Sequence, residues 1–258
     1  KKKLIMHVSD LKTVCVARKN QCAIKALEYL IYKKKNFNIV SLTNRSDKGK
    51  DGWQKSFKKF SLKKKIKILK TEELYKINNL FLFSFEYEHL LKNKLFKKDN
   101  LFNFHFSLLP KYRGCHTNFY QIFNGEKNSG VTLHKIDSGI DTGKIIDRIT
   151  FKIKPNDTAY QNYLRLMEYS FLLFKTNFNR IIKGNYKTKK QNLKKGSYFS
   201  RESVNYNKLI KIKKIDNKMS THNLIRSLIF PAFQLPIHKG RKIKRSVYKN
   251  NKIKLSFI

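Results

Sequence analysis

The stretch NFHFSLLP at residues 103–110 combines an apolar and a polar face in one predicted strand. A strand alternates its side chains with a period of two residues. The apolar face consists of Phe102, Phe104 and Phe106. The polar face consists of Asn103, His105 and Ser107. Buried polar groups cost free energy unless each finds a partner. A polar row that ends at a break, Leu109-Pro110, therefore predicts a functional site at the end of a sheet.

Around this stretch, predicted strands alternate with predicted helices. Short apolar runs predict strands at 13–17, 38–42, 66–69, 80–85, 130–136 and 144–153. Apolar residues at helical spacing predict helices at 22–32, 71–77, 86–96 and 157–182, with a short helix near Phe57. The alternation predicts an α/β fold with a Rossmann-like, mostly parallel sheet flanked by helices. In such sheets, ligands bind at the carboxyl ends of the strands.

The composition changes near Lys183, where a polar and basic stretch begins. We expect a main domain at 1–183, a linker at 184–196 and a small C-terminal α+β domain at 197–258. The C-terminal domain is predicted to contain a helix at 221–229 and basic strands near Ile243 and Ile253.

The chain carries a strong excess of positive charge. Its 258 residues include 58 Lys and Arg against 17 Asp and Glu, a formal net charge of +41. Such a charge suggests a polyanionic partner. The lysines are scattered along the whole chain, however, which favours compositional drift on solvated faces and makes nucleic acid the less favoured partner. With 40% hydrophobic residues the chain can bury a core, so an intrinsically disordered protein is excluded.

The sequence also bounds the location of the protein. The three cysteines, Cys15, Cys22 and Cys115, form no CxxC pair, and their odd number is typical of a reducing cytoplasm. No apolar run reaches the length of a membrane span, and the basic start at 1–6 precedes no long apolar segment. We therefore expect a cytoplasmic protein with neither a membrane span nor a secretion signal.

Three residue types suggest the chemistry of the site. A histidine such as His105 can relay a proton near neutral pH, and an asparagine amide such as that of Asn103 can donate to a developing oxyanion. An acidic residue can orient the imidazole, and Asp141 lies in the glycine-rich stretch DSGIDTG at 137–143. Acyl transfer to an amine needs all three functions.

Several ordered motifs resemble those of the N10-formyltetrahydrofolate-dependent formyltransferase family. They are NxHxSLLPKYRG at 103–114, NGE at 124–126, GVTLH at 130–134 and DxGIDTG at 137–143. The resemblance is strong from about residue 100 to 150 and consistent in order from 13 to 182. It implies N10-formyltetrahydrofolate as co-substrate. It further implies that Asn103 stabilises the oxyanion, that His105 handles protons and that Asp141 orients His105 or a water.

The resemblance also suggests residues that contact the reactants. Candidate folate contacts are Phe85, Glu86, Tyr87, Asp137 and Ile140. Candidate contacts to the formyl acceptor are Lys19, Asn20, Trp53 and Ser107. The first turn carries Arg18 where the family usually has glycine, although Lys19 and Asn20 before a helix can still bind an anion. Trp53 could stack on a base or anchor a lid or core.

The other histidines show no metal-ligand spacing, so no metal site is expected. These are His89, His116, His134 and His222, which we interpret as surface or core residues.

The size of the C-terminal unit favours one formyl acceptor over the others. Within the family, glycinamide ribonucleotide enzymes are shorter, and methionyl-tRNA enzymes carry a longer C-terminal domain. We therefore expect transfer to a nucleotide-linked amino-deoxy sugar, dTDP-linked rather than UDP-linked, serving polysaccharide synthesis. One alternative is a methionyl-tRNA formyltransferase, suggested by the charge. A second is a non-catalytic, basic RNA-binding protein on this scaffold. Family analogy also suggests a homodimer through the C-terminal unit.

Overall fold

The computed structural model describes residues 11–18, 21–33, 37–85 and 87–258. They form two compact units. Unit 1 comprises the described residues within 1–105, together with Thr132–Arg148 and Ser170–Gln191. Unit 2 comprises Phe106–Val131, Ile149–Tyr169 and Asn192–Ile258. The predicted division into a main domain at 1–183 and a C-terminal domain at 197–258 stays a prediction.

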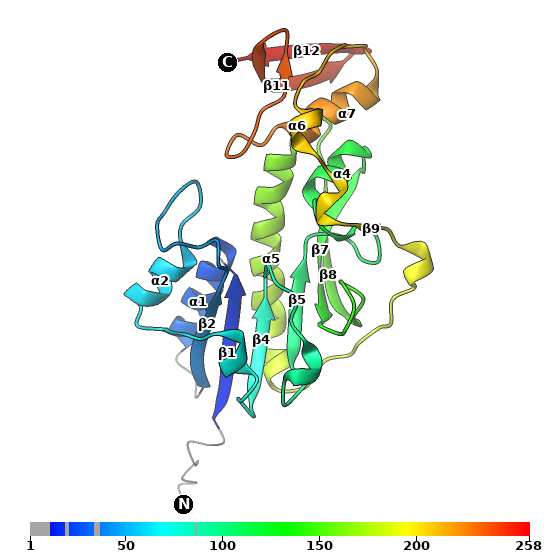
Figure 1. Ribbon diagram of the computed structural model, residues 1–258. Coiled ribbons are helices and arrows are strands. Elements are labelled where there is room, and N and C mark those ends of the chain that lie inside the picture. The colour runs from blue at the N-terminus through cyan, green and yellow to red at the C-terminus, as the bar shows by residue number, and fades with distance from the viewer. Residues whose placement is uncertain (1–10, 19–20, 34–36, 86) are drawn as a thin grey trace, which may run out of the picture. The chain divides into compact units, whose positions relative to one another are not determined.

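Seven strands form one sheet in the order β3-β2-β1-β4-β5-β7-β8 (Figure 1). The strands are β1 (Lys12–Arg18), β2 (Phe37–Thr43), β3 (Lys67–Ile68), β4 (Leu80–Ser84), β5 (Leu101–His105), β7 (Asn128–Lys135) and β8 (Ile145–Lys152). Strands β3, β2, β1, β4 and β5 pair in parallel, and β7 pairs with β5 in the antiparallel direction. The predicted mostly parallel α/β sheet is thus confirmed.

The α-helices mostly follow the predicted positions. They are α1 (Gln21–Lys33), α2 (Phe57–Lys63), α3 (Thr71–Leu74), α4 (Thr117–Phe123), α5 (Ala159–Ile182), α6 (Tyr206–Leu209) and α7 (Met219–Leu228). Short 3-10 turns occur at η2 (Asn93–Leu95), η3 (Leu193–Lys195) and η4 (Arg201–Ser203).

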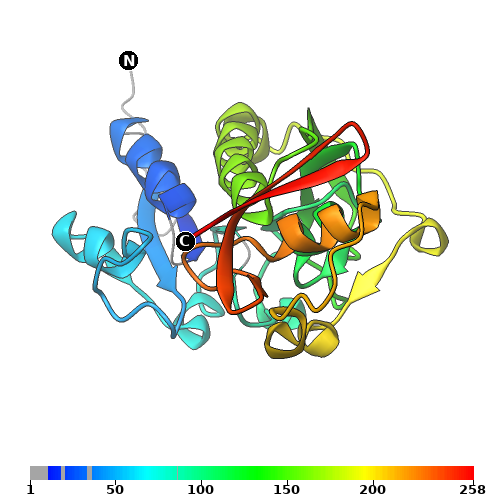
Figure 2. The same ribbon diagram turned by 90° about the horizontal axis from the view of Figure 1, so that it is seen from above.

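In unit 1, helix α1 and the end of α5 lie side by side over one face of the sheet (Figures 1 and 2). Phe174 of α5 is fully buried, and its ring meets those of Phe83, Phe85 and Phe104 at centroid distances of 5.2, 5.6 and 6.0 Å. Tyr29 of α1 meets Phe174 edge-on at 5.9 Å. The apolar face predicted for the central strand therefore packs against α5.

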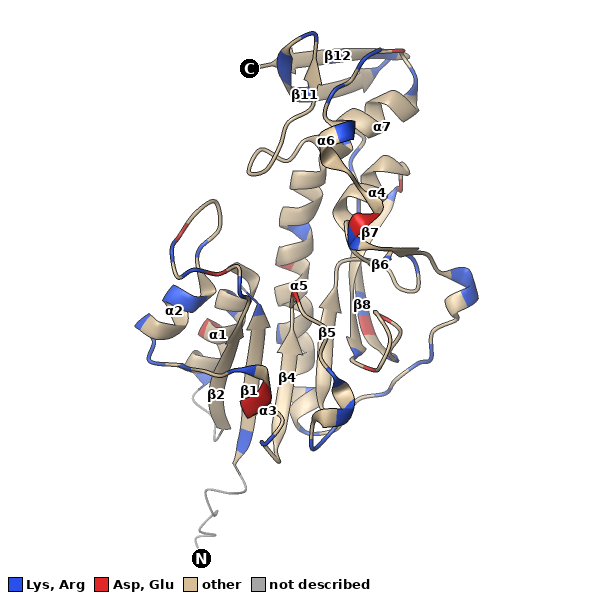
Figure 3. Ribbon diagram, viewed as in Figure 1, with Lys and Arg blue, Asp and Glu red and all other residues tan. Residues whose placement is uncertain are grey.

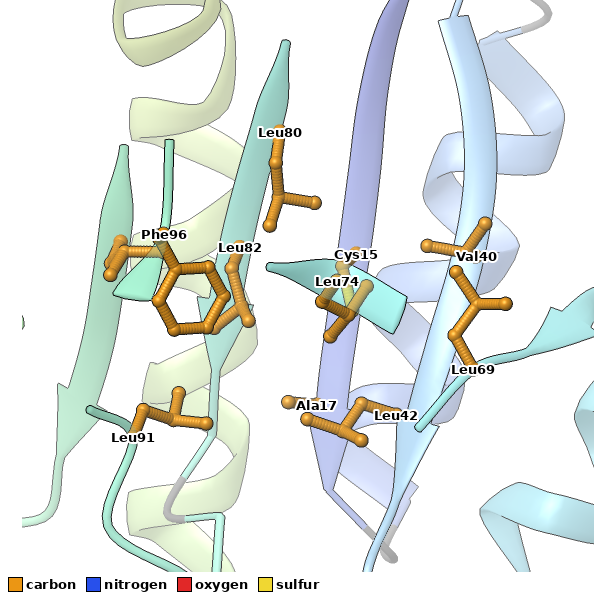
Figure 4. Close-up of a cluster of buried hydrophobic side chains, with 11 residues drawn as sticks. Cys15, Ala17, Val40, Leu42, Leu69, Leu74, Leu80, Leu82, Leu91 and Phe96 are labelled. Carbon is orange, nitrogen blue, oxygen red and sulfur yellow. The ribbon is translucent and has the colours of Figure 1, made fainter. Parts of the chain in front are cut away.

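The opposite face of the sheet is covered by α3 and by the loops around it (Figure 4). Alternate residues of β1, β4 and β5 point to this side, as the two-residue period of a strand requires. The buried cluster consists of Cys15, Ala17, Val40, Leu42, Leu69, Leu74, Leu80, Leu82, Leu91, Phe96 and Leu101. On this face, β5 continues from Leu101 to Asn103 and His105, so the strand changes from apolar to polar toward its carboxyl end.

The helix predicted at 86–96 was wrong for the described residues 87–96, which contain only the 3-10 turn η2. Leu91 and Phe96 are buried in the hydrophobic cluster on the face of the sheet that α3 covers. Ser46 holds this segment from another loop, because its Oγ donates to Glu88 Oε2 at 2.7 Å. Tertiary contacts therefore fix an irregular segment where the local apolar spacing favours a helix.

Unit 2 contains a separate core between α4, α7 and a three-stranded sheet. The sheet has the order β10-β11-β12, and its strands are β10 (Ile237–His238), β11 (Arg241–Lys249) and β12 (Lys252–Phe257). A second, two-stranded parallel sheet pairs β6 (Arg113–Gly114) with β9 (Tyr198–Phe199). The buried cluster consists of Phe119, Val204, Ile212, Ile225, Leu228, Ile229 and Ile243. The expected helix and basic strands of the C-terminal region are confirmed.

A buried polar network in unit 2 fixes the chain directly after β5. Gln121 donates from Nε2 to the carbonyl of Phe106 at 2.8 Å. Its Oε1 accepts from Ser129 Oγ and, at 3.3 Å, from Asn162 Nδ2. Because buried amides need such partners, this network specifies one main-chain path for Phe106.

Lysine and arginine residues are distributed over helices, strands and loops (Figure 3). None of the helices in the described part of the chain is both long enough and apolar enough to cross a bilayer.

The aromatic packing on α5 makes a stability prediction. Phe174→Ala should lower the free energy of unfolding by about 3–5 kcal/mol, because it removes a fully buried ring and leaves a cavity. Leu172→Ala, at an exposed position of the same helix, is the matched control and should cost much less. Denaturant unfolding measures both variants. Equal losses would contradict the packing described here.

A buried histidine in unit 2 makes a prediction for pH. His222 is fully buried; its Nε2 donates to the carbonyl of Pro155 at 3.1 Å, and its Nδ1 lies 2.8 Å from Ser246 Oγ. Burial lowers the pKa of His222, and the positive charge of Arg226 acts in the same direction. The unfolded chain then binds a proton at pH values where the folded chain does not. This contribution to stability is present above the ordinary histidine pKa of about 6.5 and is lost as pH falls below it.

Replacing this histidine by a residue that does not titrate tests the sign. The stability lost by the wild type between pH 7.5 and about 5 should exceed that lost by His222→Gln, by at most about 1.4 kcal/mol per pH unit. Unfolding midpoints of both proteins across this range measure the difference. Parallel curves would show that His222 does not contribute.

Candidate active site

Three neighbouring strands of unit 1 place polar residues in one row across the sheet. In the register of the parallel pair β4 and β5, Ser84 lies beside Asn103. In the antiparallel pair β5 and β7, Asn103 lies beside His134. His105 follows two residues after Asn103 and thus shares its face. A register shift of one residue would turn these side chains to the opposite face, so the pairing of the strands itself assembles the row.

Hydrogen bonds fix the orientation of the Asn103 side chain. Asp141 Oδ1 can only accept, which identifies the Asn103 atom beside it as the amide nitrogen, and Ser84 Oγ then donates to the amide oxygen Oδ1 at 2.8 Å. Asn103 Nδ2 lies 3.3 Å from Asp141 Oδ1 and 3.3 Å from His134 Nε2. The donor end of the amide therefore faces the carboxylate and the second histidine.

The carboxylate of Asp141 lies between two buried imidazoles. Its Oδ2 is 3.4 Å from Nδ1 of His105, and its Oδ1 is 3.4 Å from Nε2 of His134. The side chains of His105 and His134 are only 3% and 2% exposed, whereas that of Asp141 is 12% exposed. The expected approach of Asp141 to His105 is thus present, at the distance of an ion pair. A carboxylate in this position can compensate a proton on either ring.

The tautomer of His134 follows from its other contact. His134 Nδ1 lies 2.7 Å from the carbonyl oxygen of Lys135, which can only accept. Nδ1 therefore carries a hydrogen. Nε2 then either accepts from Asn103 or, when the ring is protonated, donates to Asp141. His134 is a member of this cluster that our reading of the sequence missed, since we interpreted it as a surface or core residue. Its position on the strand that pairs with β5, directly opposite Asn103, is the feature that could have indicated its place in the site.

The loop that carries Asp141 requires an unusual backbone. Asp141 has a φ of +54°, in the left-handed region that side chains other than glycine rarely adopt. Asp137 shapes the loop, because its Oδ1 accepts from the N–H of Gly139 at 3.1 Å and from Thr142 Oγ1 at 2.7 Å. Gly143 passes so close to β7 that a Cβ there would lie 1.8 Å from the carbonyl oxygen of Lys135.

The structure places the predicted folate contacts in different environments. The Phe85 ring is fully buried and stacks on Phe104 at 4.5 Å, so Phe85 could meet a ligand only through its main chain. Its carbonyl accepts a hydrogen bond from the buried guanidinium of Arg18. Tyr87 is half-buried, and burial raises the pKa of its hydroxyl. Ile140 is partly exposed in the Asp141 loop. Glu86 lies outside the described residues.

The two described candidates for acceptor contacts, Trp53 and Ser107, belong to different units. Trp53 is 42% exposed in the loop before α2 of unit 1. Ser107 belongs to unit 2, where its buried hydroxyl donates to the carbonyl of Lys111 at 2.7 Å. Lys19 and Asn20 lie outside the described residues. The roles of all these side chains stay predictions.

Within the described residues, no three His, Cys, Asp or Glu side chains are grouped so that they could hold a metal ion. The cluster of Asn103, His105, His134 and Asp141 offers amide, imidazole and carboxylate groups, which can serve proton and oxyanion chemistry.

These residues lie in a segment shared with known enzymes. Residues 33–173, more than half of the chain, match the formyl transferase family. The chain therefore belongs to the formyl transferase family, as the motifs around Asn103 and Asp141 indicated.

Solved structures of sugar-modifying members are similar over nearly the whole chain. One is an N-formyltransferase from Helicobacter canadensis, in complex with folinic acid and dTDP-3-aminofucose. It is 41% identical with a TM-score of 0.87, over 93% of this chain and 89% of that one. Another is WlaRD, a sugar 3N-formyl transferase solved in the presence of dTDP and 5-N-formyl-THF. It is 43% identical with a TM-score of 0.87, over 93% of this chain and 87% of that one.

Two further relatives extend the comparison. A methionyl-tRNA formyltransferase of Clostridium tetani is 29% identical over 238 residues, which is 86% of this chain and 75% of the relative. A bifunctional polymyxin resistance protein ArnA of Wigglesworthia glossinidia brevipalpis is 37% identical over 142 residues. This match takes in 50% of the chain and spans about a fifth (21%) of the length of that relative.

The close approach at Gly143 makes a prediction about the Asp141 loop. Gly143→Ala should lower the free energy of unfolding by about 1–3 kcal/mol, because the added methyl group must displace main chain rather than a flexible side chain. Gly52→Ala is the control, since no atom lies within 4 Å of a Cβ at that position. Thermal or denaturant unfolding measures the pair. A Gly143 variant as stable as the Gly52 variant would show that the loop has another path.

Proposed function

We propose that this protein transfers a formyl group from N10-formyltetrahydrofolate to the amine of a nucleotide-linked amino-deoxy sugar. The observation that carries the proposal is the cluster in which Asp141 lies 3.4 Å from His105 and 3.3 Å from the Asn103 amide. These residues lie in motifs of the family to which the chain belongs. The folate compounds in the two similar sugar enzymes support a formyl-folate as co-substrate.

The proposed reaction exchanges one carbon–nitrogen bond for another. The amine nitrogen of the sugar forms a bond to the formyl carbon, the bond from this carbon to folate N10 breaks, and N10 gains the proton that the amine loses. Asn103 donates to the oxygen of the tetrahedral intermediate with the amide hydrogen that is not directed at Asp141. His105 handles the proton, and Asp141 holds the imidazole in place and compensates its charge.

The finer identity of the sugar is part of the same proposal. Both similar sugar enzymes were solved with dTDP or a dTDP-linked sugar. The nitrogen is at sugar position 3 both in the ligand of the first, dTDP-3-aminofucose, and in the name of the second, a sugar 3N-formyl transferase. We therefore favour a dTDP-linked 3-amino sugar as the acceptor, in a pathway of polysaccharide synthesis. Trp53 and Ser107 remain proposed acceptor contacts, and Tyr87, Asp137 and Ile140 remain proposed folate contacts. A cytoplasmic location and a homodimer through the C-terminal unit also remain proposals.

A methionyl-tRNA formyltransferase is the second candidate. It is favoured by the 29% identity to such an enzyme over 86% of the chain and by the net charge of +41. Binding of tRNA through many phosphate contacts would weaken steeply as salt is added. A panel containing dTDP- and UDP-amino sugars as well as initiator methionyl-tRNA, each with N10-formyltetrahydrofolate, separates the two activities by the product that gains formyl mass.

Substitutions in the cluster test the assigned roles. His105→Ala should lower kcat by about 10²–10⁴-fold through lost proton transfer, and Asn103→Ala by about 10²–10³-fold through lost oxyanion stabilisation. Asn38→Ala, at an exposed asparagine of strand β2, is the matched control and should keep the wild-type rate. Initial rates with the best acceptor of the panel, and circular dichroism to verify the fold, measure the effects.

Unchanged turnover in folded His105→Ala would refute the assigned mechanism. Formylation of methionyl-tRNA alone would replace the sugar proposal by the second candidate. If the wild type formylates none of these acceptors, the remaining alternative of a non-catalytic RNA-binding protein gains support.

A further inference from the structure

The segment after α5 returns along β8 to the loop that carries Asp141. Lys189 and Ile145 exchange two main-chain hydrogen bonds, each 2.8 Å long. Two residues later, the carboxamide of Gln191 donates from Nε2 to the carbonyl of Asp141 at 2.9 Å and to that of Gly143 at 2.7 Å. A residue of the predicted linker 184–196 thus binds the main chain of a proposed catalytic residue.

The chemistry of the two contacts determines which way the Gln191 amide points. Carbonyl oxygens only accept, so the NH2 group, with its two hydrogens, must face Asp141 and Gly143. The other end of the amide, Oε1, is buried and has no hydrogen-bond partner among the described residues. A buried acceptor without a partner is costly, and a flipped amide would place Oε1 against two carbonyl oxygens. The two hydrogen bonds that Nε2 donates therefore determine the orientation of the Gln191 side chain.

Gln191 binds the loop at the residue whose backbone is left-handed. The carbonyl that it binds belongs to Asp141, the residue with the left-handed φ of +54°. A non-glycine residue in this region persists when the surrounding structure determines its conformation. The same backbone conformation directs the Asp141 carboxylate to within 3.4 Å of both His105 and His134.

We propose that Gln191 is a positioning residue for formyl transfer, which holds the Asp141 carboxylate between His105 and His134 through the carbonyls of Asp141 and Gly143. The proposal rests on the proposed function for its effect on catalysis. Its structural part, the order of the loop, does not depend on which sugar is the acceptor.

The test compares Gln191→Met with Lys190→Met. Methionine approximates the length of glutamine but donates no hydrogen bond, and Lys190 is an exposed neighbour outside the cluster. Hydrogen exchange should show faster exchange of the amides at residues 139–145 in Gln191→Met and an unchanged pattern in Lys190→Met. With N10-formyltetrahydrofolate and a dTDP-linked 3-amino sugar, kcat of Gln191→Met should fall on the order of 10- to 100-fold with little change in KM, because the reacting groups are misplaced. Lys190→Met should keep the wild-type kcat.

A double variant separates positioning from a general loss of stability. If Gln191 acts through the Asp141 carboxylate, Gln191→Met combined with Asp141→Asn should be no slower than Asp141→Asn alone. A purely structural role would leave kcat per folded molecule unchanged in Gln191→Met, or would add its loss to that of Asp141→Asn. Either result overturns the proposal.

The exchange measurement keeps the two proposals distinguishable. Wild-type exchange rates at 139–145 in Gln191→Met would overturn the positioning role whatever the activity. If the wild type transfers no formyl group to any amino sugar, the proposed function fails, and the exchange rates alone decide whether Gln191 holds the loop.

Discussion

The placement of the Asp141 carboxylate between two buried imidazoles is the constraint on which the site depends. A carboxylate and two histidines that are almost fully buried can coexist only if their hydrogens and lone pairs are matched. The structure achieves this with Lys135 and Asn103, whose carbonyl and amide groups complete the contacts of His134. The Asn103 amide and the His134 ring then each have one orientation, which is what a preorganised site requires.

Two separate structural features bring Asn103, His105, His134 and Asp141 together. The first is strand register, which places Ser84, Asn103 and His134 side by side on β4, β5 and β7. The second is the loop that carries Asp141, whose backbone is left-handed. In this loop Gly143 lies in close contact with the main chain of β7, and the Asp137 carboxylate accepts a hydrogen bond from Thr142. The positions of Ser84, Asn103 and His134 are specified by the register of a buried sheet. The conformation of the loop depends instead on individual hydrogen bonds. The loop is therefore the part of the site that single substitutions can disturb without unfolding the sheet.

The sequence predicted those features that depend on local pattern. The alternation at Asn103 and His105 indicated a strand with a polar face, and the apolar runs indicated the parallel sheet; both are present. The helix expected at 86–96 was wrong because Leu91, Phe96 and Glu88 are held by distant partners. His134 and Gln191 were missed for the same kind of reason. His134 reaches Asp141 through strand pairing, and Gln191 reaches it from a segment 50 residues further along the chain. No local period in the sequence reveals either contact.

The central claim is that the cluster directs a formyl group to a sugar amine rather than to water. An isotope-labelled formyl group on N10-formyltetrahydrofolate tests it directly, with a dTDP-linked 3-amino sugar as acceptor and the label followed by NMR. We expect a labelled formamide on the sugar and unlabelled tetrahydrofolate. Label that remains on the folate, or that is released as formate while the sugar is unchanged, would contradict it.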